Sequence, residues 1–161
     1  MSVSANRIWR QLPEETRISA GKLFWAEPKS TGKQLLSASL AKAKNLRQVT
    51  VRKAPAERLA NWTAGTLSLP EPIVEELLKN YLLHEHREVI ISFLELLKIP
   101  HADGMIDEAF DLATPSNEQV QKAARSLLGS NDRMGAVLYL QYLVLQGGPW
   151  ATVEEVLAAE E

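Results

Sequence analysis

The sequence predicts an all-α protein, a single compact multi-helix domain with about seven or eight helices. Two observations favour this class. Apolar residues recur at helical spacing through the C-terminal two-thirds of the chain. The β-branched run at residues 49–51 is the one strand-like stretch, and a single tripeptide cannot make a sheet. With 161 residues and 45% hydrophobic content, the chain is long enough to bury a core as one domain, residues 1–161.

The N-terminal third predicts helices whose boundaries are set by proline. Pro13 opens a helix that runs through roughly Glu27, and residues 33–45 form a second helix. Residues 49–51 are read either as an extended segment or as a helical turn. Pro55 suits the first turn of the next helix, because its missing N–H has no intrahelical partner there.

Two apolar faces follow each other between residues 72 and 98. The first contains Val74, Leu77, Leu78, Tyr81 and Leu82, and the second contains Ile90, Phe93, Leu94 and Leu97. One helix of about 27 residues would be long for a globular protein. We therefore expect a break near residues 84–86 and a helical hairpin over 72–98.

The remaining helices are predicted from caps and stops. Residues 106–112 are expected to form a short helix, and the next starts at Thr114-Pro115 or at Ser116 with Gln119 and stops at Gly129.

The most apolar helix of the chain covers residues 132–146. Asn131 or Asp132 caps it, Gly147 ends it, and its composition predicts that other helices surround it. Thr152 and Glu155 stand at the spacing of a capping box for a last short helix.

Charge is divided unevenly along the chain. Residues 1–58 carry 12 Lys or Arg against 4 Asp or Glu, a net of +8, and residues 59–161 carry a net of −10. Between Pro28 and Ala56 there are seven basic residues and no acidic one. We interpret this as mutual attraction of the two parts, within one fold or between copies, with a possible subdomain boundary near residues 65–72. A protein partner or self-association is therefore expected.

The segment LAKAKNLRQVTVRKA, residues 40–54, resembles the centre of a helix-turn-helix motif. Ala41 stands at the small position, Asn45 at the turn, and Val51 at an aliphatic position that fixes the second helix on the first. The resemblance implies nucleic-acid binding through the polar and basic residues of this segment. These are Lys42, Lys44, Arg47, Gln48, Thr50, Arg52 and Lys53.

All three histidines lie between residues 84 and 101. His84 and His86 are two apart and about 200° around a helix, so a regular helix cannot bring both to one metal ion. His84 shares a face with Glu88, and a following loop could bring His101 and Asp103 to them. These four residues are the candidate ligands for zinc or manganese in a metal-dependent enzyme.

Several chemistries have no sequence support. The chain has no cysteine, KSTGKQ at residues 29–34 lacks the first glycine and the strand of a phosphate-binding loop, and no G-x-S-x-G elbow is present. We therefore expect no cofactor and assign no catalytic residue.

No signal-peptide core or apolar stretch of about 20 residues is present, so we expect a cytoplasmic protein without membrane contact. The first functional interpretation is a non-enzymatic protein-interaction or regulatory module. The second is a DNA-binding regulator that uses residues 40–54, and the third is the metal-dependent enzyme.

Overall fold

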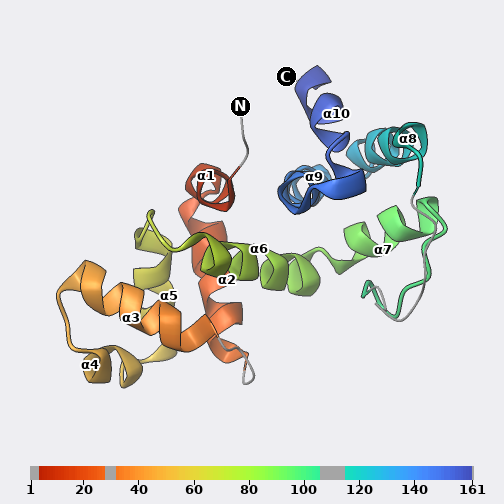
Figure 1. Ribbon diagram of the computed structural model, residues 1–161. Helices are drawn as coiled ribbons and strands as arrows, with labels where there is room; N and C mark the ends of the chain where they lie inside the picture. Colours follow the sequence, from red (N-terminus) through yellow and green to blue (C-terminus); the bar gives the residue numbers. More distant parts are fainter. Residues whose placement is uncertain (1–3, 28–31, 106–114, 161) are drawn as a thin grey trace. The chain divides into compact units, whose positions relative to one another are not determined.

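The computed structural model describes residues 4–27, 32–105 and 115–160, and all regular elements in these ranges are helical (Figure 1). The predicted all-α class is confirmed. Ten α-helices and one 3₁₀ helix lie in the described ranges, more than the sequence predicts. In chain order they are α1 (Ala5–Gln11), α2 (Glu14–Ala26), α3 (Gly32–Lys44), α4 (Gln48–Arg52), α5 (Ala56–Gly65), α6 (Glu71–Glu85), α7 (Arg87–Leu96), α8 (Asn117–Leu128), α9 (Arg133–Gln146), η1 (Gly148–Trp150) and α10 (Val153–Ala159).

Contacts divide the chain into two compact units, an N-terminal unit of residues 2–81 and a C-terminal unit of residues 82–161. The division lies inside α6, beyond the boundary predicted near residues 65–72. The charge asymmetry follows the units, because the N-terminal unit carries 13 Lys or Arg against 7 Asp or Glu and the C-terminal unit carries 5 against 13. That the chain forms one domain stays a prediction.

Helices α2 and α5 form the tightest pair of the N-terminal unit. Their backbones meet where Gly21 faces Ala60, and a Cβ on Gly21 would lie 3.2 Å from both the Cα and the carbonyl oxygen of Ala60. Polar contacts complete the pair: Trp25 Nε1 donates to Thr63 Oγ1 at 2.9 Å, and Arg17 Nε donates to the carbonyl of Ala64 at 2.9 Å. Small residues thus set the distance between these helices.

Helix α1 is absent from the sequence predictions because a distant residue supplies part of its N-terminal cap. Ser4 Oγ accepts from the backbone N–H of Arg7, but the carboxylate of Glu71 accepts from the N–H groups of Ala5 and Asn6 at 2.9 and 3.1 Å. The Asn6 side chain donates to the same carboxylate at 2.9 Å. Burial raises the pKa of Glu71, but these hydrogen bonds outweigh burial and keep that pKa below its ordinary value.

The predicted break at residues 84–86 is confirmed, but the hairpin prediction needs correction. Helix α6 ends at Glu85 and α7 begins at Arg87, with His86 alone between them at φ −131° and ψ 31°. The helices of an αα-hairpin are joined by about two to five loop residues. The segment from 72 to 98 is therefore two helices joined by a one-residue kink.

Helix α9 is central to the C-terminal unit, as its composition predicts, and packs against α7, α8, α10 and η1. Phe93 of α7 is fully buried beside two rings, with centroid distances of 5.5 Å to Tyr139 and 5.8 Å to Trp150. Burial raises the pKa of Tyr139 above its ordinary value, so the phenol stays neutral.

The caps of this unit are mostly as predicted. Ser116 and Gln119 form the capping box of α8, and Asp132 caps α9. The capping box predicted at Thr152 is wrong, because the Thr152 hydroxyl instead accepts a hydrogen bond from Gln121 Nε2 at 2.6 Å. The short helix predicted over 106–112 lies outside the described residues.

Within the described ranges, no helix is both long enough and apolar enough to cross a lipid bilayer.

Candidate functional site

The segment that resembles a helix-turn-helix forms two packed helices, α3 and α4, joined by a tight turn. Asn45 adopts a left-handed conformation at φ 55°, and the N–H of Leu46 donates to the carbonyl of Ala41 at 2.8 Å. Ala41 and Val51 are both buried, and α3 contacts α4. The three positions that carry the resemblance therefore have the local geometry that it implies.

The side chains predicted to bind nucleic acid are all exposed. They are Lys42, Lys44, Arg47, Gln48, Thr50, Arg52 and Lys53. Two aliphatic side chains lie exposed among them in sequence, Leu46 at 37% and Val49 at 57%. We call these nine residues the α3–α4 face. It combines five cations with apolar surface and contains no acidic side chain.

The second helix departs from a DNA-recognition helix in its length. Helix α4 has five residues and ends at Arg52, three residues before Pro55. Five helical residues span only about 7.5 Å, so α4 offers little more than one turn to a groove. Pro55 and the β-branched residues at positions 49–51 explain why α4 is short.

The four candidate metal ligands have separate surroundings. His84 and Glu88 are exposed, His101 Nδ1 accepts from the N–H of Gly104 at 3.0 Å, and Asp103 accepts from Arg87 at 2.6 Å. Among the residues that the structure describes, no group of three or more His, Asp or Glu side chains is arranged to hold a metal ion. The predicted set is therefore not assembled.

Among the described residues, the histidine that the metal prediction leaves out makes the shortest contact between a basic and an acidic side chain. His86 Nδ1 lies 2.5 Å from Asp132 Oδ2, and the other oxygen of Asp132 accepts from the N–H of Gly135 at 3.0 Å. Any Cβ at position 135 would collide with both side chains. The sequence indicates that Asp132 caps a helix, but it gives no sign that His86, 46 residues away, contacts this carboxylate. The contact ties the start of α9 to the α6–α7 kink.

Protonation of Asp132 is expected to lower stability in acid. Burial raises its pKa, but hydrogen bonds from His86 and Gly135 and the charge of His86 outweigh burial and hold that pKa below its ordinary value. A depressed carboxyl pKa stabilises the fold above the unfolded-state pKa of about 3.9, and the contribution is lost as pH falls through the folded-state pKa. Asp132→Ala should therefore cost about 1–2 kcal/mol at neutral pH and progressively less below about pH 4.

Urea unfolding of wild type and Asp132→Ala at several pH values measures this difference. Asp132→Asn is the matched control, because asparagine caps helices as well as aspartate does but carries no charge. A difference that stays constant through the acidic range would contradict the role of the carboxylate.

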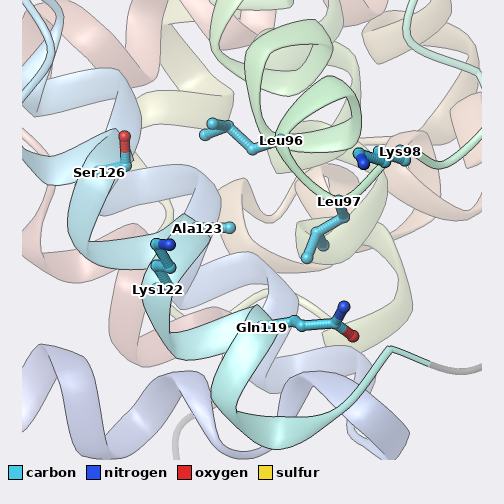
Figure 2. A pocket seen from close by; sticks show the side chains of 7 residues that line it. All are labelled: Leu96, Leu97, Lys98, Gln119, Lys122, Ala123 and Ser126. Carbon is cyan, nitrogen blue, oxygen red and sulfur yellow. The ribbon is translucent and has the colours of Figure 1, made fainter.

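A second surface, which sequence reasoning does not indicate, lies between α7 and α8. A pocket of about 370 Å³ is lined by the end of α7, the two residues that follow it, and α8. Figure 2 shows the lining residues: Leu96, Leu97, Lys98, Gln119, Lys122, Ala123 and Ser126. Helical periodicity assigns Leu97 and Ala123 to core faces, and that assignment gives no reason to expect a pocket beside them.

Comparison with protein-family models, curated proteins and solved structures finds no match for this chain.

Proposed function

We propose that this protein is a non-enzymatic interaction module whose α3–α4 face binds an acidic surface of a protein partner. The observation that carries the proposal is the exposure of five cations together with Leu46 and Val49 on two packed helices and the residues that flank α4. Cations give charge complementarity and fast association, while exposed aliphatic side chains gain free energy only against another apolar surface. Protein interfaces combine both kinds of contact.

A protein partner fits this face better than a phosphate backbone does. Val49, the second residue of α4, is more than half exposed, and contact with phosphates would leave its side chain in water. The Asn45 turn and the buried Val51 also hold the face in one conformation, which lowers the entropic cost of binding.

The test uses an acidic, partly apolar probe. A fluorescein-labelled peptide of about 20 residues, with Glu interspersed with Leu and Phe, is titrated with the full chain at low and near-physiological salt. We expect a Kd in the range of about 10–100 μM that weakens with salt. The triple variant Arg47→Gln, Arg52→Gln, Lys53→Gln should weaken binding at least about tenfold.

The apolar part of the face is tested separately. Leu46→Ser with Val49→Ser changes no charge, so it should weaken binding to the peptide about fivefold or more while leaving DNA binding unchanged. Lys79→Gln with Arg125→Gln, which removes two exposed cations outside the α3–α4 face, is the matched control. No binding at low salt, or equal loss in this control, would overturn the proposal.

DNA binding is the second candidate function. The observation that favours it is the agreement of Ala41, Asn45 and Val51 with the helix-turn-helix positions. For this function we expect the affinity for a labelled random-sequence duplex, measured by fluorescence anisotropy, to fall steeply with salt. A plot of the logarithm of the binding constant against the logarithm of the salt concentration should have a slope near −0.9 for each neutralised phosphate. Binding to the duplex that exceeds binding to the peptide, and that survives the Leu46 and Val49 substitutions, would replace the first proposal with this one.

A further inference from the structure

The pocket between α7 and α8 is one end of a longer groove. A neighbouring pocket of about 450 Å³ is lined by Ser92, Glu95, Leu96, Ser126, Leu127 and Ser130. The two pockets share Leu96 and Ser126, so they join at these residues. From Gln119 to Leu128, where α8 ends, the helical rise gives a length of about 13.5 Å, and Ser130 lies two residues further along the chain. This length corresponds to about two and a half turns of a helix.

We infer that this groove binds an amphipathic helix of a protein partner, with an apolar side chain over Leu96 and a carboxylate at Lys98 and Lys122. The inference goes beyond the proposed function, because it concerns the C-terminal unit and does not depend on the α3–α4 face.

Leu96 provides the apolar centre of the groove. It is the last residue of α7 and is 49% exposed, although it borders both pockets. The neighbouring floor is also apolar, with Ala123 and Leu127 buried and Leu97 half-buried. An exposed leucine between two hollows offers a position for a side chain such as leucine, which buries apolar surface on both partners.

Charge gives the bound helix a direction. Lys98, two residues beyond the end of α7, and Lys122 of α8 line the first pocket (Figure 2), whereas Glu95 lines the second. Acidic side chains of the partner are therefore stabilised at the lysine end. The amino end of the partner helix, with its partial positive charge, is stabilised beside Glu95.

A helix fits the groove better than a small molecule does. Small-molecule sites enclose most of the ligand surface. Here Lys98, Gln119, Lys122 and Ser126 are exposed, and the two hollows lie in a row along the helices. A row of shallow hollows instead suits side chains that repeat three or four residues apart along a helix.

The experiment uses a labelled alanine-based helical peptide with two leucines four residues apart and two glutamates one turn later. We expect the full chain to bind it with a Kd of about 10–100 μM. Leu96→Ser should weaken binding at least about tenfold, as should Lys98→Glu with Lys122→Glu. A peptide with lysines in place of its glutamates should restore binding to the charge-reversed variant but bind wild type poorly.

Controls separate this inference from the proposed function. The variant Arg47→Gln, Arg52→Gln, Lys53→Gln should bind the helical peptide like wild type. Circular dichroism should show that Leu96→Ser, a change at a half-exposed site, leaves the fold intact. No binding of the peptide, binding unaffected by Leu96→Ser, or no rescue by the lysine peptide would overturn the inference. Binding of sodium octanoate at the same residues without binding of the peptide would also overturn it.

Discussion

Replacing Phe93 with alanine is expected to lower the free energy of unfolding by about 4 kcal/mol. Phe93 is fully buried on α7, and its ring lies 5.5 Å from the ring of Tyr139 and 5.8 Å from that of Trp150. The substitution removes the transfer free energy of a whole ring, and the surrounding rings cannot collapse fully into the space. The change also removes the ring pairs, worth about 0.5–1.5 kcal/mol each. Urea unfolding followed by circular dichroism gives the difference.

Leu96→Ala is the matched control for Phe93→Ala. Leu96 lies three residues further along the same helix, but about half of it is exposed, so its truncation should cost less than about 1 kcal/mol. The two variants also separate stability from binding, since Leu96→Ala should weaken helix binding in the α7–α8 groove while leaving the unfolding midpoint almost unchanged. Equal destabilisation by both variants would contradict the position of Phe93 at the centre of the C-terminal unit.

Helices whose signals are local could be predicted from the sequence. The limits of α9 follow from its apolar composition, the cap at Asp132 and the stop at Gly147, all within a few residues of the helix ends. The capping box of α8 at Ser116 is local in the same way. These elements show that helix ends can be predicted when the capping hydrogen bonds join residues that are close in sequence.

Features that depend on distant residues could not be predicted. Helix α1 receives part of its cap from Glu71, more than 60 residues away. The apolar pattern on both sides of His86 indicates a break but carries no information on its geometry, and a one-residue kink and a hairpin have the same pattern. Such contacts depend on tertiary packing, which overrides local preference.

The candidate surfaces also differ in whether the residues that form them lie close together in the sequence. The turn at Asn45 and the burial of Val51 could be predicted, because one short segment contains the whole motif. The α7–α8 groove could not, since its walls come from helices separated by about 20 residues and its residues are individually unremarkable. The metal prediction needs a loop that brings His101 and Asp103 to His84. In the structure His101 instead contacts Gly104, and Asp103 contacts Arg87.

Replacing Gly21 with leucine is expected to destabilise the protein by about 3 kcal/mol or more. In the α2–α5 pair even a Cβ at this position would lie 3.2 Å from the backbone of Ala60. The obstructing atoms belong to the main chain of α5, so a change of side-chain rotamer cannot relieve the contact. The helices would have to separate, which would stretch the hydrogen bonds from Arg17 to Ala64 and from Trp25 to Thr63. Thermal and urea unfolding by circular dichroism measure the loss.

Gly65→Ala is the matched control for Gly21→Leu, because a Cβ on Gly65 would meet no atom within 4 Å. Gly65 is the last residue of α5, and alanine there reduces the entropy of the unfolded chain. We therefore expect no destabilisation, and a gain of up to about 1 kcal/mol. A helix-propensity effect alone would make both substitutions favourable. Opposite signs at the two glycines can arise only if close packing of α2 on α5, and not helix propensity, requires glycine at position 21.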